Sequence, residues 1–434
     1  MERSVDQHLL AWKDSPTRKV LLVRGARQIG KTYSIRQLGK HFKHFIEVNF
    51  EEHPEIESFF ERSLSPAPLC EKLAIYFDTP IIPGETLLFF DEIQANANAI
   101  KSLRFFYEKM PELHLIAAGS LLEFTLEEIP SFGVGRIQNL FMYPLTFKEY
   151  LIARGDQKLA ALIHNSSPSN PIDPVIHQKI LELLKVFQLI GGMPEVVDTY
   201  IKSSNLNQCQ IILDNIITSI IDDFAKYKKR APVSRLREVF NSIVHQTGRK
   251  FKYSNIAEGS SQTFREALDL LVKAGLAYKI HHTSARGLPL AAQINHKKFK
   301  VLLFDTGIYQ RMLGLDLSDY IVSDFKTLIN KGNQAELFAG LELIANDSPH
   351  TRPELYYWHR EAKSSNAEVD YIIAHKGHII PIEVKSGTRG QMQSIHIFLS
   401  ERNLPSGIRL SHETHSSHPP ISTLPLYAAS TLYN

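Results

Sequence analysis

The chain has 434 residues, 43% of them hydrophobic and 22% charged, which suffices for about two to four globular domains with ample cores. Its formal net charge of +3 is nearly neutral for this length, so any nucleic-acid surface must be a local patch. The N-terminus lacks the apolar segment of a signal peptide, no apolar run approaches the roughly 20 residues of a membrane helix, and the two cysteines have no metal-binding spacing. We therefore expect a cytoplasmic protein that does not associate with membranes.

The first predicted strand, residues 20–23, leads into a glycine-rich loop and then a helix. The loop reads G-x-x-x-x-G-K-T, the phosphate-binding motif of P-loop NTPases. Its glycines let backbone N–H groups turn toward a phosphate, and the helix N-terminus adds partial positive charge. We expect Lys31 to reach the β- and γ-phosphates of ATP and the Thr32 hydroxyl to bind magnesium. The predicted nucleotide-binding residues are Gly25, Ala26, Arg27, Gln28, Ile29, Gly30, Lys31 and Thr32.

A second apolar strand, residues 86–90, ends in two carboxylates, Asp91 and Glu92. This is the Walker B pattern, in which the aspartate holds magnesium directly or through water. The glutamate is then a candidate base that polarises the attacking water. Behind a complete phosphate-binding motif, this interpretation is preferred over an acidic turn. Lys31, Thr32, Asp91 and Glu92 are thus predicted to form one catalytic site for ATP hydrolysis with magnesium.

A third buried strand, residues 114–118, is followed by Gly119 and Ser120. Ser120 could contact the γ-phosphate or the attacking water, and a simple Gly-Ser turn fits the sequence equally well. Arg136 follows in a glycine-flanked loop and is a candidate arginine finger, although a surface arginine is the simpler interpretation. The alternation of strands and helices predicts an α/β fold with a parallel sheet.

Beyond residue 150 the pattern is helical up to about residue 231, and a three-helix segment follows. Residues 276–280 and 290–294 could form a hairpin after these helices, which is the winged-helix arrangement, with the third helix offered to DNA. Use of this domain only for protein packing is an equally open alternative. A further strand, residues 300–304, ends in Asp305, which we expect to cap the next helix. Candidate phosphate contacts are Arg249, Lys250, Lys252, Arg265, Lys273 and Arg286.

The last predicted domain places acidic residues on a helix and on neighbouring strands. Glu336 lies on the helix, Asp370 on one strand, and Glu383 and Lys385 on the same side of another. The three carboxylates could share a magnesium ion, with Lys385 activating water for phosphodiester attack. Salt-bridged strand ends in a small α/β domain are the alternative. The polar chain after about Ser411 is predicted to be a flexible tail.

These motifs, with the order Pro144-Leu145-Thr146-Phe147 and Gly191-Gly192-Met193-Pro194 between them, resemble a family of bacterial and archaeal AAA-type ATPases. The residues around Glu336, Glu368-Val369-Asp370 and Glu383-Val384-Lys385 resemble that family's restriction-endonuclease-like domain, of the PD-(D/E)xK type. The resemblance covers nearly the whole chain. It implies an α/β P-loop NTPase core (1–150), a helical lid (151–231), a winged helix (232–320) and a nuclease-like domain with a flexible tail (321–434).

Two classes of function remain open at this point. The first is an ATPase that acts on or near DNA, with ATP-coupled cleavage as one form of that action. The second is a nucleotide-controlled switch or scaffold that binds DNA or a protein partner without cutting it. ATP and magnesium are the expected cofactors in both. The sequence leaves the oligomeric state open, since an arginine finger from a neighbouring subunit and a monomer are both allowed.

Overall fold

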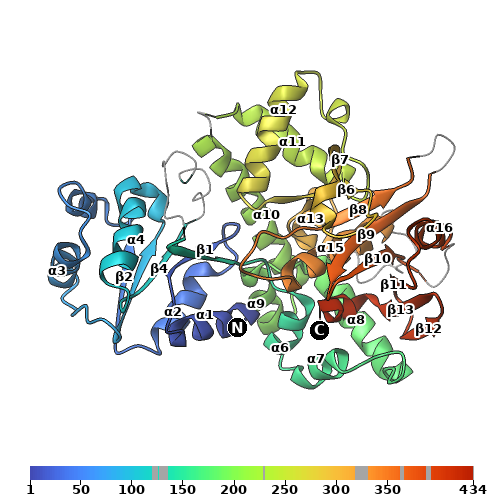
Figure 1. Cartoon of the computed structure of the whole chain (residues 1–434), viewed down its shortest axis with the longest axis horizontal. Helices are drawn as coiled ribbons and strands as arrows, with labels where there is room; N and C mark the ends of the chain where they lie inside the picture. The colour runs from blue at the N-terminus through green and yellow to red at the C-terminus, as the bar shows by residue number, and fades with distance from the viewer. Residues whose placement is uncertain are drawn as a thin grey trace. The chain divides into compact units, whose positions relative to one another are not determined.

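The computed structural model describes residues 1–119, 126, 135–227, 230–317, 331–361, 366–387 and 392–433 (Figure 1). Two units can be distinguished by their internal contacts. Unit 1 comprises Met1–Tyr143 and Ser348–Arg352, and unit 2 comprises Pro144–Asp347 and Pro353–Asn434. The predicted lid, winged helix and nuclease-like domain therefore lie in a single unit. Among the described residues, none of the helices combines the length and apolar character needed to cross a bilayer.

Unit 1 is built on a five-stranded sheet in which every neighbouring pair is parallel, with strand order β2-β3-β4-β1-β5. Strands β3 and β4 are buried along their whole length, as expected for inner strands of a parallel sheet. The predicted parallel α/β sheet is confirmed. The strands are β1 (Val20–Arg24), β2 (His44–Asn49), β3 (Thr86–Asp91), β4 (His114–Ala118) and β5 (Ile137–Phe141).

Helix α1 precedes the first strand of unit 1, and the other helices lie between successive strands. A short return of the chain covers the open edge of β5, where Phe141 N donates to Pro349 O (2.7 Å). Covering this edge removes unpaired backbone groups that would otherwise be available to other chains. The helices are α1 (Ser4–Asp14), α2 (Lys31–Gly39), α3 (Pro66–Tyr76) and α4 (Ala97–Lys109), with 3-10 segments at Pro54–Phe60 and Ile93–Ala95.

Unit 2 contains an eight-stranded mixed sheet of order β12-β13-β11-β10-β9-β8-β6-β7. The predicted hairpin, β6 with β7, joins the C-terminal strands because β6 pairs in parallel with β8. The predicted boundary at residues 320 and 321 thus runs through a continuous sheet. The strands are β6 (Ala277–Thr283), β7 (Ile294–Leu303), β8 (Tyr356–His359), β9 (Glu368–His375), β10 (His378–Val384), β11 (Gly407–Ser411), β12 (Ser416–His418) and β13 (Ile421–Pro425).

The second strand of the hairpin lies further along the chain than predicted. Leu290–Gln293 forms a 3-10 turn, and β7 then places Leu303 opposite Ala277 and Ile294 opposite Thr283. The outer half of β7 is polar and partly exposed, so it lacks the apolar run by which a buried strand is recognised. One consequence is that Lys300 lies within the sheet rather than at the start of a separate strand.

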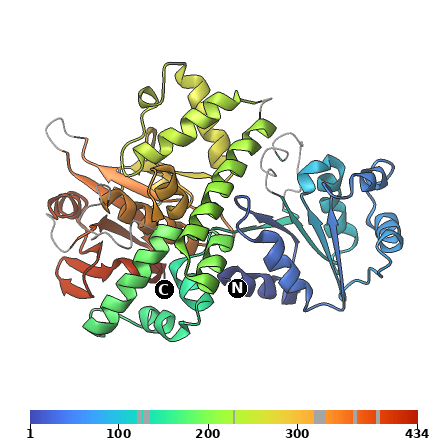
Figure 2. The same cartoon turned by 180° about the vertical axis from the view of Figure 1, so that it is seen from behind.

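The helices of unit 2 lie mainly before the hairpin, and Figure 2 shows the long ones in green. The second helix of the predicted winged helix is only a 3-10 turn, Tyr253–Asn255. The helices are α6 (Phe147–Ala153), α7 (Gln157–His164), α8 (Pro174–Ile190), α9 (Pro194–Ser203), α10 (Leu206–Asp223), α11 (Val233–Gln246), α12 (Ser261–Lys273), α13 (Thr306–Met312), α15 (Lys331–Asn346) and α16 (Gln393–Arg402).

Three sequence motifs of unit 2 meet at one buried junction. Leu145 N donates to Gly192 O (2.7 Å), and Gly192 N donates to a carboxylate oxygen of Asp305 (2.7 Å). The other Asp305 oxygen accepts from Ile308 N (2.9 Å), which confirms the predicted cap of α13. Burial raises the pKa of Asp305 to about 6, although these N–H donors lower it. The junction explains why a Gly-Gly turn is needed here, since a Cβ on Gly191 would lie 2.2 Å from Asp305.

The predicted flexible tail is instead part of the fold. After β13 the chain forms a 3-10 segment, Leu426–Tyr433, whose residues Leu426 and Tyr427 are buried. His415 is also buried, and its Nε2 lies 2.8 Å from Ser166 Oγ. Composition misled the prediction because serine and histidine form the edge strand β12, which pairs with the adjacent β13, while His415 contacts Ser166, 249 residues away in the sequence.

Candidate functional site

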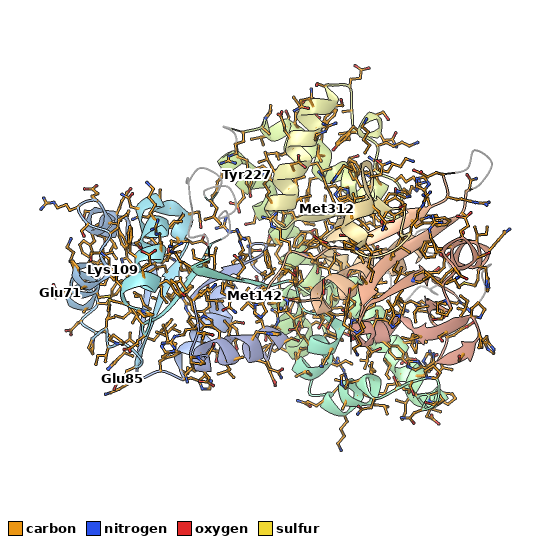
Figure 3. All side chains as sticks on the ribbon, in the orientation of Figure 1. Glu71, Glu85, Lys109, Met142, Tyr227 and Met312 are labelled. Atoms are coloured by element: carbon orange, nitrogen blue, oxygen red, sulfur yellow. The ribbon has the colours of Figure 1, made fainter. Side chains whose placement is uncertain are left out.

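The phosphate-binding loop connects β1 to α2 and contains three residues with positive φ. These are Gly25 (140°), Gln28 (64°) and Gly30 (92°), so the backbone takes the curled path that a phosphate cradle requires. A Cβ on Gly25 would lie 2.3 Å from the carbonyl oxygen of Met142, which is labelled in Figure 3. The side chains of Ala26 and Ile29 are buried, so these two residues face a phosphate only through their backbone.

Lys31 begins α2 and folds back over the loop. Its ammonium donates to Gly25 O (3.0 Å) and Ala26 O (2.7 Å), and only 8% of the residue is exposed. Burial lowers the pKa of Lys31 to about 8, against the opposing effect of nearby Glu92 and Asp91. The ammonium therefore lies at the centre of the loop, and a bound phosphate would take over its hydrogen bonds from the two carbonyls.

The phosphate-binding loop and the Walker B strand meet at Thr32 and Asp91. Thr32 Oγ1 donates to Asp91 Oδ2 (2.8 Å), while Asp91 Oδ1 accepts from Glu92 N (2.9 Å). Asp91 is 5% exposed, and burial raises its pKa. A hydroxyl and a carboxylate side by side at the head of a phosphate-binding loop are the oxygen donors that magnesium prefers. These residues fit the expected magnesium ion.

Glu92 is held by a residue that the sequence did not single out. Its φ of 47° is left-handed, and its Oε2 accepts from Gln94 Nε2 (2.6 Å). Gln94 also packs against the end of β4, where a Cβ on Gly119 would lie 1.9 Å from Gln94 Oε1. Gln94 thus links the ends of β3 and β4. The signal available in the sequence was its spacing of two residues from Glu92, which by itself is weak.

Ser120 and Arg136 are the two remaining residues that were predicted to act in ATP hydrolysis. Ser120 lies outside the described residues. Arg136 forms an ion pair with Glu108 on α4 (Nε to Oε1, 2.6 Å), and Glu108 also binds Arg104 (2.9 Å). With its side chain 36% exposed, Arg136 lies on the surface of unit 1. Its role as an arginine finger remains a prediction.

The nuclease-like residues of unit 2 surround a lysine that the sequence analysis left out. Lys300 Nζ lies 2.8 Å from Glu336 Oε1, 2.6 Å from Glu368 Oε1 and 3.7 Å from Asp370 Oδ1. Its side chain is 1% exposed. Burial lowers the pKa of Lys300, but the carboxylates raise it by a larger amount. The net shift is therefore upward, and the ammonium stays charged.

The remaining members of the predicted nuclease site are also paired. Lys385 Nζ donates to Glu383 Oε1 (2.6 Å), and Asp370 Oδ2 accepts from Val384 N (2.8 Å). Glu383 Oε2 is buried without a hydrogen-bond partner among the described residues, which is the one feature that suits a metal.

The donor set as a whole does not fit a metal. Within the described ranges, Glu336, Asp370 and Glu383 do not bring three ligand atoms within 4.8 Å of one another, whereas His282, His359 and Glu361 do. The ammonium of Lys300 already lies against Glu336 and Asp370.

The predicted DNA-facing side of unit 2 carries exposed basic residues. Lys252 and Arg265 are exposed, and Lys250 is an exposed residue paired with Glu368 (3.5 Å). On the third helix, Asp269 pairs with Lys279 of the hairpin. The surface therefore offers separate basic side chains among acidic ones.

Three stretches of the chain match known protein families. Residues 17–151 match an AAA domain, residues 181–319 a domain of unknown function (DUF8612), and residues 331–418 a second one (DUF4143). An uncharacterized protein of Methanocaldococcus jannaschii is 23% identical over 294 residues. That alignment spans 65% of this chain and 60% of the relative.

Solved structures show only distant similarity. The Aeropyrum pernix ORC1 protein, solved in complex with DNA, aligns at 13% identity and a TM-score of 0.30 over 74% of this chain and 95% of its own. The S. cerevisiae Hsp104–ADP complex aligns at 12% identity and a TM-score of 0.29 over 63% of this chain and 38% of its own. Neither similarity is high enough to carry an argument. The match of residues 17–151 to an AAA domain agrees with the parallel sheet and the phosphate-binding loop of unit 1.

Proposed function

We propose that this protein binds ATP with magnesium in unit 1 and hydrolyses it. The observation that carries the proposal is the 2.8 Å hydrogen bond between Thr32 and Asp91, because it brings the two halves of the motif to one point. The loop N–H groups and Lys31 would hold the phosphates, and Thr32 and Asp91 would hold the magnesium ion. The magnesium ion would neutralise negative charge on the phosphates. Glu92 would accept a proton from the attacking water.

The test separates binding from hydrolysis. Lys31→Ala is expected to lose ATP binding, measured by isothermal titration, together with phosphate release. Glu92→Gln is expected to keep binding and to lose about 100-fold or more in kcat, as for removal of a general base. Lys40→Ala is the control, since Lys40 is an exposed residue at the other end of α2 whose ammonium donates to Gln37 (2.8 Å). Unchanged turnover in Lys31→Ala would refute the proposal.

For the role of this hydrolysis, we favour a nucleotide-controlled switch over a nuclease. The specific observation is that the nuclease-like carboxylates Glu336 and Asp370 face Lys300 of the same unit. DNA is a candidate partner because Lys252 and Arg265 are exposed on the predicted winged helix. In this proposal ATP and ADP forms differ in affinity for the partner.

This second proposal has its own experiment. Purified protein is incubated with plasmid and single-stranded DNA in magnesium or manganese, with and without ATP, beside Glu383→Ala. A switch predicts no cleavage in any condition and a DNA affinity that differs between ATP and ADP and falls in Arg265→Glu. Cleavage that is lost in Glu383→Ala would establish a nuclease instead.

A further inference from the structure

The carboxylate cluster of unit 2 surrounds one ammonium group supplied by β7. Lys300 approaches Glu336 on α15 and Glu368 and Asp370 on β9, with Nζ–O distances of 2.8, 2.6 and 3.7 Å. Its Nζ also lies 5.3 Å from the ring centroid of the buried Tyr357. We propose that Lys300 is the resident cation of this nuclease-like site, so that the site holds together without a divalent metal.

The charge balance around the cluster supports this assignment. A buried carboxylate is strongly disfavoured unless a cation or hydrogen-bond donors compensate it. Glu336 is buried and Asp370 is half-buried, with 17% of its side chain exposed, and both face the ammonium of Lys300. Glu383 has its own partner in Lys385 (2.6 Å). Each acidic group therefore lies beside a lysine, and Lys300 is shared by Glu336, Glu368 and Asp370.

The geometry is also unfavourable for magnesium. Magnesium requires near-octahedral oxygen ligands at about 2.0–2.1 Å and keeps several waters. An ammonium 2.6–2.8 Å from two of the carboxylates lies where such an ion would contact them, and its positive charge repels a second cation. A divalent ion could enter only if the Lys300 side chain left the cluster.

The position of Lys300 in the chain gives the cluster a second role. β7 belongs to the hairpin of the predicted winged helix, whereas Glu368 and Asp370 belong to β9, which is separated from β7 by β6 and β8 in the sheet. The ion pairs thus connect the hairpin to the nuclease-like strands through side chains as well as through the backbone ladder. Lys300 fixes the two parts as one body.

The experiment measures Mn²⁺ binding by electron paramagnetic resonance, on the full chain without nucleotide. We expect the wild type to show no tight Mn²⁺ site that is lost in Asp370→Asn, which distinguishes this cluster from the group His282, His359 and Glu361. Lys300→Gln removes the ammonium and is expected to bind about one Mn²⁺ per chain, at least about tenfold more tightly than wild type. Lys297→Gln is the matched control, because Lys297 is an exposed lysine on the same strand. Adding Asp370→Asn to Lys300→Gln should abolish the new binding.

Two results would overturn the proposal. One is tight Mn²⁺ binding by the wild type that is lost in Glu383→Gln. The other is a folded Lys300→Gln protein that binds no more Mn²⁺ than Lys297→Gln. If Lys300→Gln does not fold, the charge-balanced pair Lys300→Met with Glu368→Gln replaces it. That pair leaves the net charge of the cluster unchanged and keeps Glu336 and Asp370, which face the Lys300 position, so the same expectations apply to it.

Discussion

At the scale of single residues, Gln94 is the position whose substitution is most informative about catalysis. Its amide holds Glu92 (2.6 Å) without being placed to touch ATP in the proposed mechanism. Gln94→Ala should therefore lower kcat by about tenfold, a fraction of the general-base contribution, and change the KM for ATP by less than about twofold. Steady-state phosphate release measures both constants. A raised KM with unchanged kcat would show that Gln94 acts in binding instead.

A second residue, Glu342, predicts how stability depends on pH. Its carboxyl group is buried, accepts from Phe147 N (2.8 Å) and lies near Glu149, and burial raises its pKa from 4.5 to about 8. The folded state thus keeps a proton that the unfolded state loses above pH 4.5. The contribution of this proton to the free energy of unfolding is fully present below about pH 4.5. It is lost as the pH rises toward 8, on the order of 3–5 kcal/mol in all.

The substitution that tests this titration is Glu342→Gln, which is neutral at every pH and keeps an acceptor for Phe147 N. We expect it to match wild type in thermal unfolding at pH 5 and to exceed it at pH 8. The measurement is the unfolding midpoint of both proteins across this range. Parallel midpoint curves would show that Glu342 does not titrate in the folded protein.

At the scale of elements, the junction between α6, α9 and α13 depends on a glycine. A Cβ on Gly192 would lie 2.2 Å from Leu145 O, so Gly192→Ala must displace the backbone that the junction holds. We expect the free energy of unfolding to fall by about 3 kcal/mol, because the added methyl group overpacks the junction and breaks its hydrogen bonds. Gly287→Ala is the control, because nothing lies within 4 Å of its added Cβ. Calorimetric midpoints compare the two, and equal midpoints would contradict the steric argument.

The same scale shows what sequence patterns can predict. The phosphate-binding loop and the strands of unit 1 were predictable because their signals are local: a fixed motif and continuous apolar runs. The cap by Asp305 was predictable for the same reason. Lys300 was not, because its carboxylate partner Glu336 lies 36 residues away and a polar run concealed the strand that carries it. Gln94 was missed because a spacing of two residues from Glu92 is a weak signal. Its other contact, Gly119, follows a different strand, β4.

At the scale of the whole molecule, the last residues of the chain are expected to be essential to unit 2. Deleting residues 412–434 removes β13, which pairs with β11, and the buried Leu426 and Tyr427. Each buried apolar side chain contributes roughly 2 kcal/mol, so the loss approaches the total stability of a domain. We expect the truncated protein to be rapidly cleaved by trypsin in unit 2, whereas His418→Ala, at an exposed position, should resist like wild type. Equal resistance of the truncated protein would restore the flexible-tail prediction.

The strand order of the eight-stranded sheet has a consequence for how the protein is made. Most of unit 1 lies within the first 143 residues, so its five strands can pair while the ribosome is still translating the rest. Unit 2 has no such opportunity, because β6 needs β8 as its parallel neighbour and β11 needs β13. The edge of β6 therefore stays unpaired until the C-terminal segments emerge from the ribosome. During synthesis, this unpaired edge is the part of the protein most in need of a chaperone.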